Sequence, residues 1–538
     1  MSSIIGQTSG MAAGTLASRI TGVFRDIALV AAIGTGIFSD TYSVANSIPN
    51  IIYILIAGGA INAVFIPALI RHMEDDEDSG KQFTDQLLTL VGLVLLGIVV
   101  LALLLAGFIV HLYATRLWTP QEFEVATFFA RWCLPQIFFY GLYTLAAQIL
   151  NSRNSFVLPM YAPIINNIIV IGTALIFISV MTQVPTADSV SQTQLNLLGF
   201  GTTLGVMAQA LILIPALKKS GYNYRPNFKF RNVGNGKVGS LAKWTVGFVL
   251  VNQITFLVIS NLTTLANALV AGNPSLTAVG FTSYQKGQLM MMLPHSIITV
   301  SVITALLPRL SKQAHDKDLA AFGGELSASL RLVSALIIPS AVFLVATGPW
   351  IGSLLYGYGA STTEQGAALG AVAAVFALGL PAFSLFYVLL RSYYAQENTK
   401  TPFLINLGFN ALHLLIGVSL FMVLSQEFKV AGLALGYSIS YVITCAVTWR
   451  RVSARVPELR NNGHLRLISR VLLASTIAGL LAYLLVRLSI ASELGISALR
   501  LGAAIALFAT SFSFLYLGFA KLFRITEVWA VLALVRRK

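Results

Sequence analysis

The amino-acid sequence predicts an all-α protein that crosses a membrane many times. Of its 538 residues, 56% are hydrophobic and only 10% are charged, whereas soluble domains are about a quarter charged. Apolar runs of about 20 residues recur along the chain, which is the length that a membrane-spanning helix needs. The runs lack the alternation of a half-buried strand, and a helix satisfies every backbone group within a bilayer.

The positions of these runs predict about 14 spanning helices. Their approximate centres are residues 22, 56, 98, 136, 168, 206, 255, 298, 342, 380, 412, 440, 478 and 508. Because this number is even, both ends of the chain are expected on the same side of the membrane.

The positive charge is concentrated in alternate loops. The turns GTGIFSD, AGNPS and YGYGAST contain no lysine or arginine. Basic residues are enriched in cytoplasmic loops, so we expect both termini in the cytoplasm. This distribution accounts for the net charge of +15 without a nucleic-acid partner. The basic loops contain Lys218, Lys219, Arg225, Lys229 and Arg231, then Arg309, Lys312 and Lys317, then Arg450, Arg451, Arg455 and Arg460.

The chain contains an internal repeat. AVFIPALIRH matches TALLPRLSKQ with Pro67 on Pro308, and GLYTLAAQILNSRNSFVLP matches SLFYVLLRSYYAQENTKTP with Pro159 on Pro402. The offsets, 241 and 243 residues, are nearly equal. They span an even number of helices, so the two halves have the same orientation and are related by a pseudo-two-fold axis along the membrane normal.

The repeat predicts two lobes of six helices each. Residues 1–218 form the first lobe, the basic linker 219–238 lies in the cytoplasm, and residues 239–455 form the second lobe. Residues 456–538 add two helices and a basic tail.

Interrupted helices at matching positions indicate where a transporter binds its cargo. The second helix contains Pro49 followed by Gly58 and Gly59, and the eighth contains Pro294. We expect hinges or gates at these residues, beside a cavity between the lobes.

Charged residues in the first helix are candidates for a binding site. The stretch SRITGVFRD places Arg19, Arg25 and Asp26 in an apolar run. A charge at the bilayer centre costs about 2.5–3.5 kcal/mol on insertion scales, so it faces water, pairs, or reaches the interface. Arg19 shares a helix face with Asp26, and Arg25 shares one with Ser18. Either Arg25 binds an anion such as a pyrophosphate, or it pairs with Asp26 while Arg19 extends to the interface.

Other polar residues add to this set. Lys286, near the start of the eighth helix, would supply a further cation to the binding site. Asp40 either faces the cavity or caps the second helix. His295 and His413 each fit a cavity or a hydrogen-bonded position in the core.

The sequence predicts neither an enzyme nor a resident cofactor. Cys133 and Cys445 lie in apolar helices without metal-site spacing, which is typical of buried thiols. GNGKVG lies in a basic loop with no preceding strand, so it predicts a flexible hinge rather than a nucleotide site. Energy for transport would come from ions or the membrane potential. Asn406 and Asn410, on one helix face, either bond to another helix or help to hold a sodium ion.

Several segments resemble the MurJ/MviN family of lipid II flippases, within the multidrug/oligosaccharidyl-lipid/polysaccharide exporter superfamily. They are SRITGVFRD, SDTYSVANSIPN, AGGAINAVFIPAL, LPHSIITVSVITALLPRLS and VLLRSYYAQENTKTP, in this order between residues 10 and 455. The resemblance implies a protein of the bacterial plasma membrane that moves lipid II, the undecaprenyl-pyrophosphate-linked peptidoglycan precursor, to the outer leaflet by alternating access. Roles in cell-wall synthesis and cell shape follow from that activity.

The resemblance also implies roles for particular residues. Arg19 and Arg25 match the family's cavity arginines, and Asp40 matches its cavity aspartate. Asn406 and Asn410 match part of a sodium site found in some members. The last two helices would form a groove for the lipid tail, and membrane lipids and cell-wall synthesis proteins are the implied partners.

The chain departs from the family pattern in two helices. The family's arginine pair and glutamate on the second helix correspond here to Tyr53, Ile54 and Gly58. In place of the arginine on the eighth helix, only Lys286 lies nearby, and it would act on a phosphate as a point charge without bidentate geometry.

Three functions are consistent with these features. The first is a lipid II flippase. The second is a related polysaccharide-lipid flippase or a cation-coupled drug antiporter, although an antiporter would be expected to have 12 helices and acidic cavity residues. The third, of another class, is a membrane scaffold for cell-wall enzymes, which would tolerate Arg25→Ala.

Overall fold

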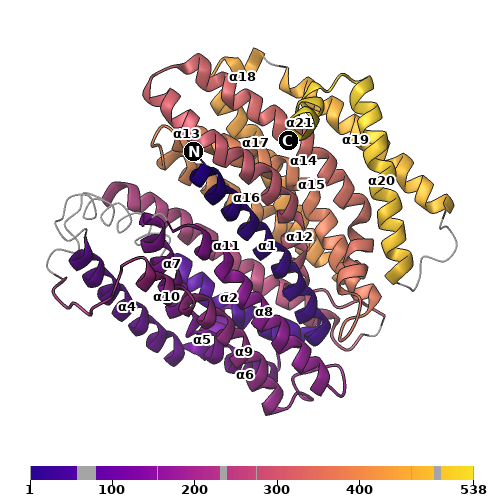
Figure 1. Cartoon of the computed structure of the whole chain (residues 1–538). Helices are drawn as coiled ribbons and strands as arrows, with labels where there is room; N and C mark the ends of the chain where they lie inside the picture. The colour runs from indigo at the N-terminus through magenta and orange to yellow at the C-terminus, as the bar shows by residue number, and fades with distance from the viewer. Residues whose placement is uncertain are drawn as a thin grey trace. The chain divides into compact units, whose positions relative to one another are not determined.

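The computed structural model describes residues 2–56, 80–153, 155–230, 239–273, 275–461, 463–489 and 498–536. These residues form helices joined by turns, with no strand among them (Figure 1). Twelve helical stretches of the described chain are long and apolar enough to cross a membrane. The prediction of an all-α, polytopic membrane protein is therefore confirmed.

The described helices fall into two compact units. The first contains residues up to Ala268 together with Gly359–Ser361, and the second contains Leu269–Tyr358 and Thr362–Lys538. The lobe boundaries read from the repeat stay a prediction.

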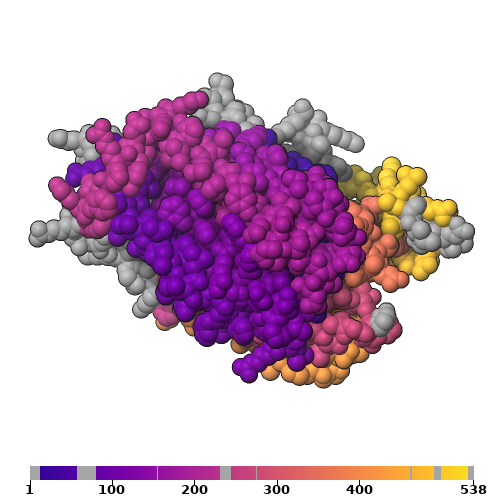
Figure 2. Space-filling view, turned by 90° about the horizontal axis from the view of Figure 1, so that it is seen from below, coloured from indigo at the N-terminus to yellow at the C-terminus, as the bar shows by residue number. Residues whose placement is uncertain are grey.

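The first unit is built from ten helices of the described chain. They are α1 (Ser2–Ile33), α2 (Ile37–Ile56), α4 (Lys81–Leu104), α5 (Ala106–Tyr113), α6 (Pro120–Cys133), α7 (Gln136–Ser152), α8 (Val157–Val180), α9 (Gln192–Leu211), α10 (Leu213–Lys219) and most of α11 (Gly239–Val270). Figure 2 shows one face of this unit, on which the violet residues from α4 onwards adjoin the magenta residues around α9 and α10.

The second unit contains the remaining helices. They are α12 (Phe281–Pro294), the π-helix η3 (His295–Thr299), α13 (Val300–His315), α14 (Leu319–Tyr356), α15 (Thr363–Tyr394), α16 (Lys400–Val423), the 3₁₀-helix η4 (Gln426–Phe428), α17 (Lys429–Ser453), α18 (Glu458–Asn461), α19 (His464–Ser489), α20 (Ala498–Leu522) and α21 (Thr526–Arg536).

The second pair of repeat segments forms equivalent helix–turn–helix structures. α7 ends at Ser152 and α8 begins at Val157, whereas α15 ends at Tyr394 and α16 begins at Lys400. Both turns therefore fall at the same place in the repeat. In the other pair, AVFIPALIRH lies outside the described residues.

Helices α14 and α15 approach each other closely because both present glycine. A Cβ at Gly352 would lie 2.2 Å from the carbonyl oxygen of Gly366, and one at Gly348 would lie 2.6 Å from that of Gly370. Small residues of this kind let helix backbones pack in a membrane, where apolar side chains gain little from leaving lipid.

The predicted hinge residues lie in different surroundings. Pro294 ends α12, and the chain continues directly as the π-helix η3, so the helix is interrupted there. Pro49 lies inside α2, which continues to Ile56. Gly58 and Gly59 lie outside the described residues.

Candidate functional site

Arg25 on α1 is fixed by two side chains of the first unit. Its Nη2 lies 3.1 Å from Oδ1 of Asp26, and its Nε donates to the same oxygen at 3.4 Å. Its Nη1 donates to Oδ1 of Asn167 on α8 at 3.2 Å. The Arg25 side chain is 32% exposed, whereas that of Asp26 is 1% exposed. The arginine is thus paired and oriented while part of its surface stays open.

Asn167 also connects α8 to the backbone of α1. Its Nδ2 donates to the carbonyl oxygen of Ser18 at 3.0 Å and to the hydroxyl of Thr21 at 2.9 Å. Positions 18, 21 and 25 recur at helical spacing, so they lie on one face of α1. That face packs against α8. Ser18 contributes its carbonyl oxygen to this contact.

Arg19 is placed differently from Arg25. Its side chain is exposed on α1, and it forms no ion pair within the described part of the chain. Arg19 and Asp26 are seven residues apart on α1, but the Arg19 side chain is exposed and the Asp26 side chain is buried.

Asp40 is completely buried in the first turn of α2. Nδ2 of Asn267 on α11 donates to its Oδ2 at 2.7 Å. The same nitrogen lies 3.5 Å from the carbonyl oxygen of Thr35. The carboxylate therefore connects the start of α2 to α11 within the first unit.

Lys286 and His295 belong to the second unit. Lys286 is half-buried on α12. His295, the first residue of η3, is buried, and its Nδ1 lies 3.0 Å from the hydroxyl of Ser384 on α15. Its ring also packs on that of Phe383, with centroids 4.4 Å apart. His295 thus has the contacts of a hydrogen-bonded core residue.

Asn406 and Asn410 are both buried on α16. Nδ2 of Asn410 donates to the backbone carbonyl oxygen of Asn406 at 2.8 Å. On the same helix, the rings of Phe409 and His413 pack against each other and against the ring of Tyr437 on α17. The sodium site at Asn406 and Asn410 stays a prediction.

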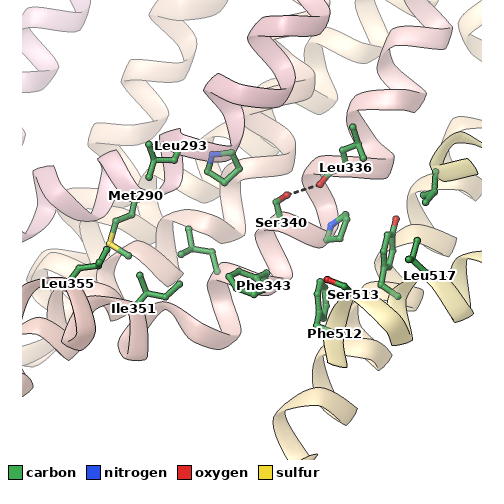
Figure 3. A pocket seen from close by; sticks show the side chains of 15 residues that line it. Met290, Leu293, Leu336, Ser340, Phe343, Ile351, Leu355, Phe512, Ser513 and Leu517 are labelled. Atoms are coloured by element: carbon green, nitrogen blue, oxygen red, sulfur yellow. Dashed lines mark hydrogen bonds between the residues drawn. The ribbon is translucent and has the colours of Figure 1, made fainter. Parts of the chain in front are cut away.

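The second unit also contains an apolar cavity of about 590 Å³ (Figure 3). Its walls come from α12, α14, α20 and the start of α21, and Pro294 is part of its lining. Phe343 of α14 and Phe512 of α20 have ring centroids 6.1 Å apart. The hydroxyl of Ser340 donates to the carbonyl oxygen of Leu336 at 2.8 Å. Because this polar group is already bonded, the cavity suits a hydrocarbon chain.

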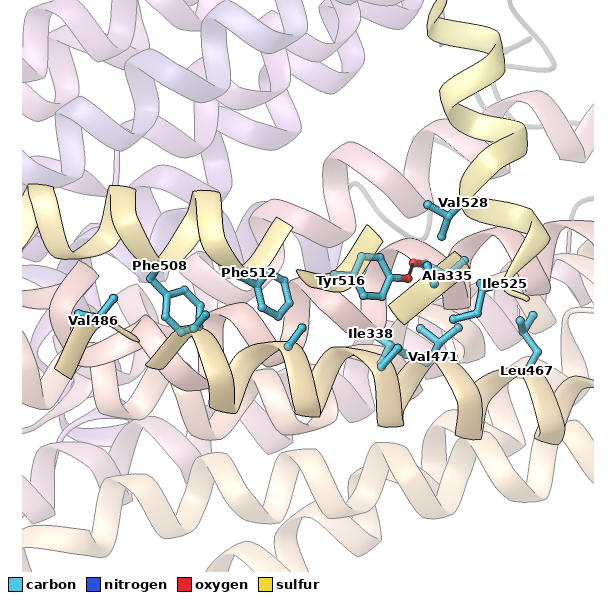
Figure 4. Packing of buried hydrophobic residues seen from close by; sticks show 14 of the residues in the cluster. Ala335, Ile338, Leu467, Val471, Val486, Phe508, Phe512, Tyr516, Ile525 and Val528 are labelled. Atoms are coloured by element: carbon cyan, nitrogen blue, oxygen red, sulfur yellow. Dashed lines mark hydrogen bonds between the residues drawn. The ribbon is translucent and has the colours of Figure 1, made fainter. Parts of the chain in front are cut away.

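A packed core supports this cavity (Figure 4). Phe508 and Phe512 of α20 are stacked, with centroids 5.7 Å apart, and the next turn places Tyr516 beside them. The Tyr516 hydroxyl donates to the carbonyl oxygen of Ala335 on α14 at 2.8 Å. Buried alanines and valines of α19, such as Val471, complete the cluster. The last two long helices are thus anchored to α14.

Long apolar helices and a paired cation within one of them define a polytopic helical membrane protein of the transporter type. A family model described as lipid II flippase MurJ matches residues 29–510. The chain therefore belongs to the lipid II flippase MurJ family.

Individual relatives agree with this assignment. The probable lipid II flippase MurJ of Thermotoga maritima is 29% identical over 530 residues, covering 98% of this chain and 99% of that protein. The lipid II flippase MurJ of Burkholderia cenocepacia is 28% identical over 400 residues, covering 73% of this chain and 74% of that protein.

Two solved structures share the fold. A lipid II flippase MurJ in an inward closed conformation has a TM-score of 0.72 at 22% identity, covering 95% of this chain and 98% of that chain. An inward-facing multidrug resistance MATE family transporter of the MOP superfamily has a TM-score of 0.64 at 13% identity, covering 82% of this chain and 96% of that chain.

Sequence reasoning missed two residues of the site. Asn167 and Asn267 each hydrogen-bond to a predicted site residue, yet neither was singled out. Both could have been identified as polar residues in apolar helices, because an asparagine in such a helix commonly hydrogen-bonds to a neighbouring helix.

Proposed function

We propose that this protein is a flippase that moves lipid II from the cytoplasmic to the outer leaflet of the bacterial plasma membrane. Membership of the lipid II flippase MurJ family, matched over residues 29–510, carries the proposal. Arg25 gives it a chemical basis in this chain, because a cation inside an apolar helix suits an anionic head group.

Arg25 retains donors for a phosphate. An arginine side chain has five N–H groups. In Arg25, two of them donate to Asp26 and one donates to Asn167. Among the contacts of the described residues, one N–H group on each Nη is left over, and these groups would bind phosphate oxygens. Asp26 and Asn167 would orient these groups before the pyrophosphate arrives. Arg19 and Lys286 would add positive charge, and Asp40 would hold α2 against α11.

The cavity of the second unit would accept part of the substrate's polyisoprenyl tail. Its lining is almost wholly apolar, and its volume lies within the range of ordinary ligand pockets. Pro294 both lines this cavity and ends α12. Bending at the junction of α12 and η3 would therefore change the cavity, as alternating access requires.

Topology and energy source belong to the same proposal. The basic loops would lie in the cytoplasm with both termini, following the distribution of lysine and arginine. The membrane potential or a sodium gradient would drive transport, since translocation of the pyrophosphate moves negative charge. Cell-wall synthesis proteins would receive the substrate on the outer side.

Complementation tests the proposal directly. A bacterial strain depleted of its own lipid II flippase receives the wild-type chain, Arg25→Ala or Arg309→Ala, with membrane levels matched by immunoblot. Arg309 is a suitable control because it forms an exposed pair with Glu325. We expect growth with the wild type and Arg309→Ala, and lysis with Arg25→Ala.

Each contrary result has a definite meaning. Failure of the wild type at a normal membrane level contradicts lipid II translocation. Rescue by Arg25→Ala contradicts phosphate binding by Arg25 and favours a scaffold. Drug efflux by the wild type without rescue would favour an antiporter.

A further inference from the structure

The segment that follows α10 is fastened along α4 in the first unit. The buried Tyr222 donates its hydroxyl to Oδ1 of Asp85 at 2.6 Å, and the backbone N–H of Arg225 lies 3.3 Å from the same oxygen. Oδ2 of Asp85 pairs with Lys81 at 3.2 Å. We call residues 222–228 the strap.

A second attachment lies one helical turn further along α4. The backbone N–H of Asn227 donates to the hydroxyl of Thr89 at 3.1 Å, and this hydroxyl lies 2.9 Å from that of Tyr224. Two attachments on successive turns hold the strap in one position.

The strap covers an apolar cavity of about 600 Å³ between α4, α7 and α10. Its lining includes Leu96 on α4, Leu142 on α7, Ile214 on α10 and Phe228 on the strap. Leu96 is 51% exposed. An exposed leucine on a helix of mean hydropathy 3.1 faces lipid, so the cavity opens towards the hydrocarbon of the bilayer.

Among the described residues, basic side chains lie in and beside the stretches of sequence that line the cavity. Lys218 is part of the lining, and Lys219, Arg225 and Lys229 are exposed residues that each adjoin a lining residue in the sequence. Within the part of the chain that the structure describes, no carboxylate belongs to the lining, and Asp85 already bonds to Tyr222 and Lys81. An apolar cavity with cations at its rim is complementary to a lipid with a negatively charged head group.

We propose that this cavity is a binding site for an anionic glycerophospholipid of the cytoplasmic leaflet. One acyl chain occupies the cavity beneath the strap, and the head-group phosphate lies at Lys218. This site is separate from Arg25 and from the cavity of the second unit. The lipid fills the space between α4, α7 and α10 and so steadies the strap.

Two glycines of α4 provide a matched pair of variants. Gly92 lines the cavity, and a Cβ added there meets no atom within 4 Å. Gly97 has the same free space but lies outside the lining. Gly92→Leu therefore fills the cavity, whereas Gly97→Leu makes the same chemical change elsewhere on α4.

The test uses the full chain in nanodiscs that contain phosphatidylglycerol with a photoreactive acyl chain. We expect crosslinks in the peptides of α4 and α7 for the wild type and Gly97→Leu, and their loss in Gly92→Leu. Lys218→Gln should reduce crosslinking roughly fivefold, the change that corresponds to about 1 kcal/mol for one basic residue near anionic lipid.

Three outcomes would overturn the proposal. The first is unchanged crosslinking in Gly92→Leu at equal protein level. The second is equal crosslinking by a matched phosphatidylcholine probe, which would remove the requirement for negative charge. The third is preferential labelling by a photoreactive undecaprenyl phosphate, which would assign the cavity to the substrate. Complementation of flippase depletion is measured separately, so failure of this site is distinguishable from failure of the proposed function.

Discussion

Nη1 of Arg25 on α1 donates to the amide oxygen of Asn167 on α8 over 3.2 Å. The two residues are 142 positions apart in the sequence. The same asparagine holds Ser18 and Thr21 through its other amide atom. One side chain thus positions the arginine and joins the two helices.

Replacement of Asn167 by leucine should reduce transport without preventing folding. A hydrogen bond to a charged group contributes about 1.5–3 kcal/mol, so we expect a loss of about tenfold to hundredfold in the initial rate. The measurement is the appearance of lipid II on the outer face of proteoliposomes, detected by an added hydrolase.

The substrate dependence of that rate separates positioning from general damage. A positioning role raises the substrate concentration at half-maximal rate, and raising lipid II restores part of the activity of Asn167→Leu. An equal loss at every lipid II concentration would argue against positioning of Arg25.

Asp40 and Asn267 should form an energetic pair. Asp40→Leu leaves the buried amide of Asn267 without its acceptor and should lower the free energy of unfolding by about 1–3 kcal/mol. Asp40→Asn keeps an acceptor and should cost less. Thermal unfolding in detergent, with the exposed Asp188→Asn as control, measures both.

A double-mutant cycle defines the coupling. If Asp40→Leu and Asn267→Leu are strictly additive, the 2.7 Å contact does not stabilise the fold.

The salt bridge between Arg331 and Glu527 should hold α21 over the cavity of the second unit. Nε of Arg331 on α14 donates to Oε1 of Glu527 at 2.7 Å, and the next residue, Val528, lines the cavity. Because the pair is partly exposed, we expect Glu527→Gln to raise the labelling rate of a cysteine at Ser340 roughly threefold. The native Cys133 and Cys445 are buried and give little background.

Glu325→Gln is the matched control for this change. Glu325 lies on α14, as Arg331 does, and its replacement removes an exposed salt bridge to Arg309 on α13. Equal effects of the two variants would show that α21 does not restrict access to the cavity.

The strap should loosen when Tyr222 loses its proton. Burial and the hydrogen bond to Asp85 raise the pKa of Tyr222 above its ordinary value of about 10. The protonated form is favoured in the folded protein, so the stabilisation is complete below pH 10 and is lost as the pH rises above it. The rate of subtilisin cleavage within residues 219–230 should therefore rise as the pH is raised above 10.

Tyr222→Phe lacks the hydroxyl that bonds to Asp85. It should be cleaved faster than the wild type at pH 8, by about fivefold if the bond contributes about 1 kcal/mol, with a weaker rise at high pH. Tyr161→Phe, on α8, is the control. An identical pH profile for Tyr222→Phe and the wild type would exclude Tyr222 as the titrating group.

The helices were predictable because their signal is local. Each predicted centre, from residue 22 on α1 to residue 508 on α20, falls within a helix. At Pro294, which lacks a backbone donor, α12 continues as the π-helix η3, and its role as a hinge stays a prediction. The sequence does not show whether Pro49 interrupts its helix. In the structure, α2 continues past Pro49 to Ile56.

The sequence by itself determined the fold class, the family and the presence of cations in an apolar first helix. These follow from composition, periodicity and short motifs. Only the tertiary structure decided which residues these charges meet. Asp40 bonds to Asn267, 227 positions away, and Arg25 bonds to Asn167. Such pairs depend on the rotation of each helix and on the neighbour it packs against, and both are set by side-chain packing across the whole unit.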